Sequence, residues 1–182
     1  MLTITIPATE LWDEKTESFM YTKEQTLQLE HSLVSLSKWE SKWNKPFFSK
    51  EKKTIEETLD YIKCMTITQN VDPKVYNSLT DDNIRQINIY IDSDMTATTF
   101  SKSIGDKKKN REIVTSELIY YWMIALNIPL ECQKWHINRL FTLIRVCNIK
   151  NQPPGKKQNQ KELASYYAQL NKERRAKLNS KG

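Results

Sequence analysis

The most constraining feature of the sequence is a strongly apolar segment between residues 114 and 147 that a single proline divides. Residues 114–127 carry large apolar side chains at helical spacing, and Thr115 is placed to cap a helix start. Pro129 follows, and because proline is tolerated in a first helical turn, a second helix is predicted from there to Cys147. Two consecutive helices this apolar predict the central hairpin of a helical core.

Three further helices are predicted upstream. Apolar residues at steps of four, three and seven predict a helix over residues 24–43, which ends before Pro46. Thr54 and Glu57 can form a capping box for the next helix, with Ser49 as an alternative cap. The predicted buried stripe of that helix is Ile55, Leu59, Ile62 and Met65. Thr80 is the predicted cap of a third helix, whose inward residues are Ile84, Ile87 and Ile91.

The first 22 residues have a different period. Leu2, Ile4 and Ile6 alternate with threonines, which is typical of a half-buried strand. A hairpin alone is marginal in water, so we expect it to lie on the helices. The predicted fold class is mainly α. It comprises a compact helical domain over residues 1–150, with a β-hairpin or small sheet at about 1–22, and a basic helical C-terminal arm over 151–182.

Positive charge is concentrated near the C-terminus. From Lys150 onward nine lysines and arginines stand against two glutamates, a net of +7, which leaves −1 of the total +6 for the first 149 residues. The arm also carries apolar residues at helical spacing; its candidate partner-binding residues are Leu163, Tyr166, Tyr167, Leu170, Arg174 and Arg175. A second basic segment is a predicted loop with Lys102, Lys107, Lys108, Lys109 and Arg111. Two interpretations stay open: solvated charge that maintains solubility, or a site for an acidic partner.

Catalytic and metal chemistry find little support in the sequence. With three glycines, a phosphate-binding glycine-rich loop is not predicted. His31 is placed on the polar flank of a predicted helix, and Cys132 and His136 would share a helix face four residues apart. A tetrahedral zinc site needs two more ligands, and Cys147 is about four turns away. We therefore predict no enzyme, no metal site, no cofactor, and reduced cysteines that pack in the core.

An aromatic cluster is a second candidate binding site. Trp39 and Trp43 are helical neighbours flanked by lysines, and Phe47 and Phe48 follow them. Aromatic residues interleaved with basic ones are typical of nucleic-acid surfaces, and exposed tryptophans often anchor a protein partner. Tryptophans at this spacing also pack helices together, so core packing is the competing interpretation.

Several stretches resemble one family of proteins. Residues 26–43, 95–100, 117–129, 135–154 and 170–179 are similar to small tail-region proteins of long-tailed bacteriophages and prophages, which we identify as tail assembly chaperones. The resemblance covers nearly the whole chain. It implies a small, helical, non-catalytic protein that binds the long tape-measure protein and assists assembly of the tail tube.

The resemblance also implies which partners to expect, and alternative functions remain beside it. We expect the tape-measure protein as partner, with the tail-tube protein and a second copy of the chain as further candidates, in the host cell cytoplasm. No stretch has the 18–20 apolar residues of a membrane span, so no membrane association is predicted. The alternatives are a structural or connector protein of the tail or head–tail region, and a nucleic-acid-binding protein that uses the basic arm.

Overall fold

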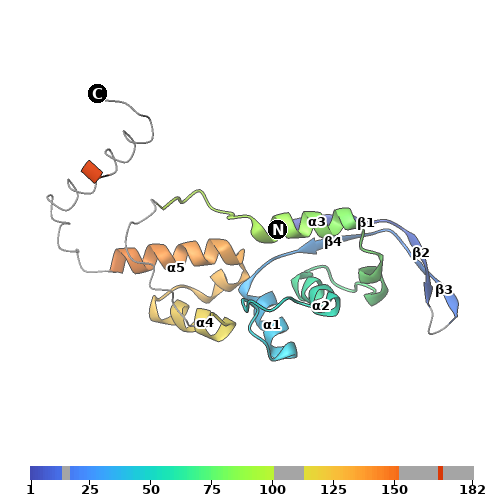
Figure 1. The fold of residues 1–182 in the computed structure, drawn as a ribbon, viewed down its shortest axis with the longest axis horizontal. Coiled ribbons are helices and arrows are strands. Elements are labelled where there is room, and N and C mark those ends of the chain that lie inside the picture. Colours follow the sequence, from blue (N-terminus) through green and yellow to red (C-terminus); the bar gives the residue numbers. More distant parts are fainter. Residues whose placement is uncertain (14–16, 101–112, 152–167, 170–182) are drawn as a thin grey trace, which may run out of the picture. The chain divides into compact units, whose positions relative to one another are not determined.

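A computed structural model describes residues 1–13, 17–100, 113–151 and 168–169. The chain divides into two compact units, Met1–Arg145 and Val146–Gly182. The elements, drawn in Figure 1, are β1 (Leu2–Ile6), β2 (Thr9–Asp13), β3 (Ser18–Thr22), β4 (Gln25–Leu29), α1 (Leu33–Trp43), α2 (Ile55–Met65), the 3-10 helix η1 (Pro73–Ser78), α3 (Asp81–Asp92), α4 (Ser116–Ala125), the 3-10 helix η2 (Leu130–Lys134) and α5 (Ile137–Asn151).

The four strands form two antiparallel pairs in a nested arrangement. β1 pairs with β4, from Leu2 opposite Leu29 to Ile6 opposite Gln25. β2 pairs with β3 further out along the same two chain segments, from Thr9 opposite Thr22 to Asp13 opposite Ser18. Together they form a long hairpin whose base, β1–β4, lies among the helices (Figure 1).

The base of this hairpin contributes to the core, and it corrects the predicted helix over residues 24–43. Ile4, Ile6, Leu27 and Leu29 are all at most 2% exposed, so the alternate residues of both strands are buried. Residues 25–29 form β4, and the helix begins only at Leu33. The prediction was wrong because Leu27 and Leu29 have the period of a strand, and pairing with β1 decides between the two periods.

The helices α1 and α2 begin at well-formed caps and pack against each other. The side chain of Ser32 accepts from the backbone N–H of Ser35 at the start of α1, and Thr54 accepts from Glu57 at the start of α2, as predicted. Inside the pair, Trp39 Nε1 donates to the carbonyl oxygen of Glu57 over 2.8 Å. Of the stripe predicted for α2, Ile62 and Met65 are buried and Leu59 is half-buried, whereas Ile55 is 80% exposed. The prediction for Ile55 was wrong: it is the first residue of the helix, and its side chain faces away from the buried side.

Helix α3 lies along β1. Thr80 caps it as predicted, and Asn83 in its first turn donates from Nδ2 to the carbonyl oxygen of Thr5 over 3.2 Å. Ile87 and Tyr90 are its buried apolar residues. The strand pair β1–β4 is thereby covered by a helix and completes the apolar core of the unit.

The apolar segment after residue 113 confirms one predicted helix and alters the other. α4 begins after Thr115, as predicted. Pro129 precedes the short 3-10 helix η2, and α5 begins only at Ile137. The long helix from Pro129 was wrong because Trp135 is extended and Ser32 pairs with His136 in an isolated β-bridge, which interrupts the helical backbone.

The fold class is thus mainly helical with antiparallel strands at the N-terminus. No helix among the described residues is long and apolar enough to cross a membrane. The arm predicted over residues 151–182 lies outside the described residues except at Asn151 and at Ala168–Gln169, which are helical.

Candidate protein-binding surfaces

Helix α4 carries apolar side chains on all of its sides, but only one side is buried. Its inward side is Ser116, Ile119 and Met123, each at most 1% exposed. On its outward side Tyr121 is 63% exposed and Ile124 is 69% exposed. A helix that is apolar all round is ordinarily enclosed by protein or lipid. The outward side of α4 is therefore an apolar surface without a partner among the residues that the structure describes.

The outward residues of α4 have a regular spacing. Glu117, Tyr121 and Ile124 are at steps of four and three, so they form one stripe. Leu130 of η2 is also exposed, at 55%. We call Tyr121, Ile124 and Leu130 the α4 surface. Its spacing is the one that a helix uses to pack against another helix.

Buried polar contacts hold α4 in place. The carboxylate of Glu40, on α1, is buried; its Oε2 accepts from the backbone N–H of Ser116 over 2.7 Å, and its Oε1 accepts from that of Phe47 over 2.7 Å. Thr115 caps the helix, and Tyr120 donates to Gln133 Oε1 over 2.9 Å, which links α4 to η2. The α4 surface is therefore presented by a firmly anchored helix.

A second exposed apolar surface lies on the β2–β3 hairpin. Trp12 and Phe19 are opposite each other in the register, with ring centroids 4.9 Å apart in an edge-to-face contact. Tyr21 lies two residues along β3 from Phe19, opposite Glu10, so all four side chains lie on one face of the strand pair. The aromatic residues are 53%, 66% and 68% exposed for Trp12, Phe19 and Tyr21. We call these three residues the hairpin surface.

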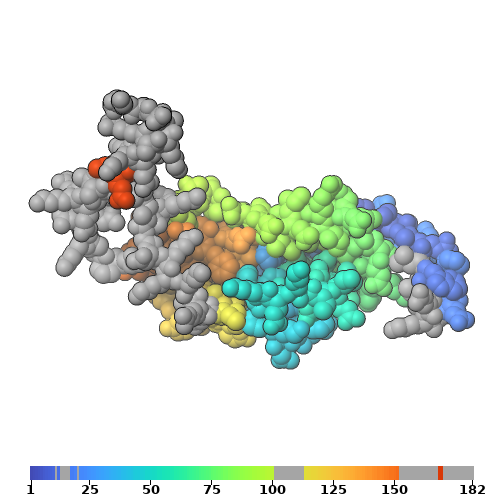
Figure 2. Space-filling view, viewed as in Figure 1, coloured from blue at the N-terminus to red at the C-terminus, as the bar shows by residue number. Residues whose placement is uncertain are grey.

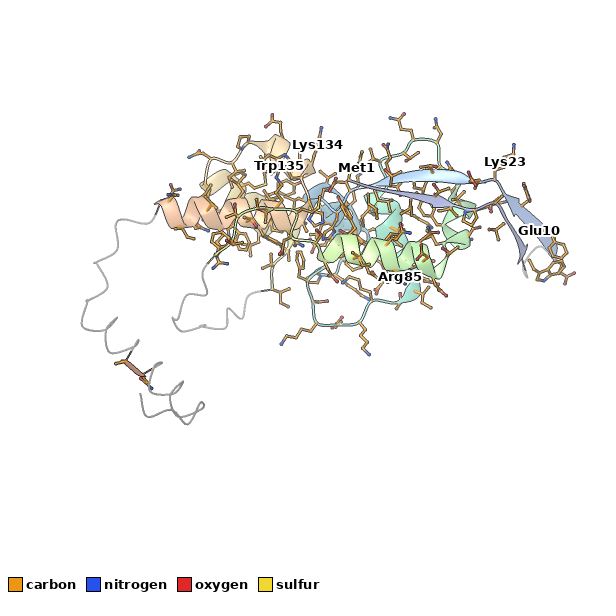
Figure 3. All side chains as sticks on the ribbon, turned by 90° about the horizontal axis from the view of Figure 1, so that it is seen from above. Met1, Glu10, Lys23, Arg85, Lys134 and Trp135 are labelled. Atoms are coloured by element: carbon orange, nitrogen blue, oxygen red, sulfur yellow. The ribbon has the colours of Figure 1, made fainter. Side chains whose placement is uncertain are left out.

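The hairpin surface projects from the helical part of the unit. Figures 1 and 2 show β2–β3 beyond the helices, and Glu10 is labelled at its end in Figure 3. Hydrogen bonds hold its base: the Thr22 hydroxyl donates to the carbonyl oxygen of Thr9 over 3.1 Å and shares a 3.0 Å hydrogen bond with Ser78 of η1. The sequence pattern predicts a hairpin here, but its aromatic face was not among the predicted sites. The spacing of two residues between Phe19 and Tyr21, which places both on one face of a strand, was the available signal.

The aromatic cluster predicted as a binding site is largely internal. Trp39 is 1% exposed and Phe47 is 9% exposed, so the structure corrects their assignment to a partner surface. Trp43 is half-buried and donates from Nε1 to Asp60 Oδ2 over 3.0 Å, while Phe48 is 38% exposed. Trp39 and Phe47 are buried because they pack edge-to-face between α1 and α2, with ring centroids 5.3 Å apart. Core packing is the correct interpretation for these two residues.

The lysines around this cluster bind within the chain. Lys45 Nζ lies 2.6 Å from Glu57 Oε1, and Lys42 pairs with Asp60. The hydrogen bond from Lys45 is the main cause that lowers the pKa of the Glu57 carboxyl. Lys53 lies over the ring of Phe47, with Nζ 4.1 Å from the centroid. These lysines close the cluster rather than forming a separate basic surface.

Both histidines lie next to each other in the core. His31 and His136 are 2% and 4% exposed, with ring centroids 5.1 Å apart. His31 Nδ1 shares a 2.5 Å hydrogen bond with the Tyr61 hydroxyl. The predicted position of His31 on a polar flank was wrong: it lies between β4 and α1, where its carbonyl oxygen accepts from the N–H of Ile137. With so little exposure, neither ring can contact a substrate in solution.

The two imidazoles are held in the neutral form. Burial lowers the pKa of His31 to about 3, with a smaller contribution from His136. Burial also lowers the pKa of His136. The backbone N–H of Asn138 donates to Nδ1 of His136 over 3.3 Å, while Nε2 lies 3.0 Å from the carbonyl oxygen of Tyr90. A proton on Nδ1 would oppose the first contact, so the structure is suited to uncharged histidines.

The pairing of Cys132 with His136 on one helix face is not found. Cys132 belongs to η2 and His136 lies in the extended segment that precedes α5, because the helix predicted from Pro129 is interrupted there. In the described part of the chain, no group of three or more His, Cys, Asp or Glu side chains is arranged to hold a metal ion. The three cysteines are free thiols.

The candidate residues of the predicted basic loop and of the basic arm lie outside the described residues. These are the loop residues Lys102, Lys107, Lys108, Lys109 and Arg111, and the arm residues Leu163, Tyr166, Tyr167, Leu170, Arg174 and Arg175. No protein-family model matches the chain, and no curated protein or solved structure is significantly similar to it.

Proposed function

We propose that the chain is a non-catalytic assembly protein of a long-tailed phage, a tail assembly chaperone that binds the tape-measure protein in the host cytoplasm. The observation that carries the proposal is the α4 surface: a helix that is apolar on all sides and leaves Tyr121 and Ile124 more than 60% exposed. The resemblance to phage tail-region proteins supplies the identity of the partner. Both histidines are buried, which leaves the described residues without an exposed imidazole to act as acid or base.

The α4 surface fits an amphipathic helix as its ligand. Exposed apolar residues at steps of four and three on a fixed helix are the elements of helix-to-helix recognition. A tape-measure protein is long and rich in helix, and before the tail forms its apolar stripes need cover. Binding of one such stripe to Tyr121, Ile124 and Leu130 would remove both apolar surfaces from water, and this burial is the driving force for association.

Affinity capture from phage-infected cells tests the proposal. The tagged full-length chain should recover a very long coiled-coil protein that mass spectrometry identifies as the tape-measure protein. The variant Ile124→Lys should reduce that recovery at least tenfold, because a charge would be buried in the apolar contact. The matched control is Ile89→Lys on α3, since Ile89 is also an exposed isoleucine, at 65%.

Three results would contradict the proposal. Recovery of no long helical protein by the wild-type chain removes the chaperone function. Equal recovery by Ile124→Lys and wild type removes the α4 surface as the site. Mass spectrometry of purified virions is the third measurement: a chaperone should be missing from them, and stoichiometric presence would instead support a structural or connector component.

A further inference from the structure

The hairpin surface and the basic arm have complementary chemistry. The sequence from the first residue of β2 to the last residue of β3, residues 9–22, contains four acidic residues and one lysine, a net charge of −3. Trp12, Phe19 and Tyr21 are exposed within this acidic segment. We propose that the hairpin surface of one copy binds the basic arm, residues 156–178, of a second copy of the chain. This association is head-to-tail and uses a surface separate from the α4 surface.

The arm matches the hairpin surface in both charge and side-chain type. Seven lysines and arginines between residues 156 and 178 stand against two glutamates. Leu163, Tyr166, Tyr167 and Leu170 add apolar and aromatic side chains at helical spacing. Arginine and lysine bind the faces of aromatic rings as well as carboxylates, so exposed rings beside acidic residues are a suitable receptor for them.

Head-to-tail association has a consequence that a symmetric dimer lacks. After one contact forms, the pair retains one free arm and one free hairpin, so further copies can add until a ring closes or a chain grows. A symmetric contact between two hairpins or two arms would end at the dimer. The distribution of oligomers therefore distinguishes the two arrangements.

A complementation experiment with full-length chains tests the proposal. The hairpin variant carries Trp12→Ser, Phe19→Ser and Tyr21→Ser, and the arm variant carries Lys172→Glu, Arg174→Glu and Arg175→Glu. In sedimentation velocity the wild type should form oligomers beyond the dimer as its concentration rises. Each variant alone should be monomeric, whereas an equimolar mixture should form a one-to-one heterodimer, because one chain supplies the intact arm and the other the intact hairpin.

Salt and folding controls complete the test. Raising the salt concentration from 0.05 to 0.5 M should weaken the mixed heterodimer by about tenfold or more, since exposed opposite charges are screened. Far-ultraviolet circular dichroism should show that both variants fold like the wild type. If the hairpin variant is unfolded, Glu10→Lys and Glu17→Lys in a chain with intact aromatic residues should replace it, with the same expected complementation.

Four outcomes would overturn the proposal. A wild type that stays monomeric at all concentrations indicates that no second copy binds, as does an arm that binds only its own chain. An arm variant that still dimerises indicates contact between two hairpins. A mixture of the two variants that stays monomeric rejects the complementary pairing. None of these results bears on tape-measure capture through the α4 surface, so the two proposals fail separately.

Discussion

Two groups of aromatic residues with similar surroundings in the sequence have opposite positions in the structure. Trp39 and Phe47 lie beside lysines and glutamates and are buried between α1 and α2. Trp12 and Phe19 also lie beside charged residues, yet they are more than half exposed on a projecting strand pair. The difference lies in what the neighbouring charges contact. Around Trp39 they pair with each other across two helices, as Lys42 of α1 does with Asp60 of α2, and this closes the cluster.

Aromatic residues next to charges therefore do not by themselves indicate a binding surface. In the helix pair, the second helix provides both the apolar contact and the opposite charges. In the β2–β3 hairpin, the described residues provide no second layer over Trp12, Phe19 and Tyr21. Aromatic residues become a surface where the fold supplies one layer and a core where it supplies two.

The largest expected effect is on the buried group. Trp39→Ala should lower the free energy of unfolding by about 3–5 kcal/mol, because it removes a large side chain from a closed space and also the hydrogen bond from Nε1 to Glu57. Trp12→Ala, its matched control, should lower it by less than about 1 kcal/mol, since that ring is 53% exposed. Urea unfolding followed by circular dichroism measures both. Equal losses would mean that the hairpin surface is part of the core.

The second largest expected effect is a loss of stability in acid, which acts through a histidine beside the buried aromatic group. His31 borders it, with ring centroids 6.2 Å from Phe47 and 5.7 Å from Tyr61. The unfolded chain binds a proton near pH 6.5, whereas burial lowers the pKa of folded His31 to about 3. The contribution of His31 to the free energy of unfolding is therefore fully present above pH 6.5. It decreases as the pH falls, by up to roughly 1.4 kcal/mol for each pH unit.

The variant His31→Gln measures that contribution. The free energy of unfolding is determined in urea at several pH values between 7 and 4. The free energy of unfolding should depend less steeply on pH in the variant, by an amount that corresponds to nearly one proton, because glutamine does not titrate. His136, whose pKa is also lowered by burial, should account for part of the remaining slope. An unchanged slope would show that His31 is charged in the folded chain.

A smaller loss is expected where a buried charge connects the two helices to α4. Glu40→Gln should lower the free energy of unfolding by about 1–3 kcal/mol, because an amide offers one acceptor oxygen to the two backbone N–H groups of Ser116 and Phe47. Thermal unfolding is the measurement, and the control is Glu56→Gln at an exposed position of α2. A loss no larger than that of the control would indicate that Glu40 does not anchor α4.

Local patterns in the sequence predicted the helix starts that a threonine caps, but not the starts of α1 and α5. Thr54, Thr80 and Thr115 were identified as caps because capping depends on residues within one turn. The extended segment at Trp135 was missed because it depends on a pairing between Ser32 and His136, more than 100 positions apart. Such a contact has no local signature.

The candidate surfaces show the same limit. A strand pattern predicted the hairpin, but whether Trp12 and Phe19 are covered depends on elements far away in the chain. The α4 segment was predicted as the centre of the core because it is apolar on all sides, and Ile119 and Met123 confirm this for one side only. Composition could not tell a fully enclosed helix from one that has an exposed apolar side.

The smallest expected effect is the coupling free energy between the two rings of the exposed pair, which can be compared with that of the buried pair. A double-mutant cycle of Trp12→Thr and Phe19→Thr should give a coupling of about 0.5 kcal/mol or less, since the rings meet across exposed strands. Threonine keeps the strand preference of both positions. The matched cycle of Trp39→Leu and Phe47→Leu should give a larger coupling, because both rings are enclosed and the contact cannot be replaced by water. Equal couplings would mean that the exposed pair is as closely packed as the buried one, and the hairpin surface would then be a folded unit of its own.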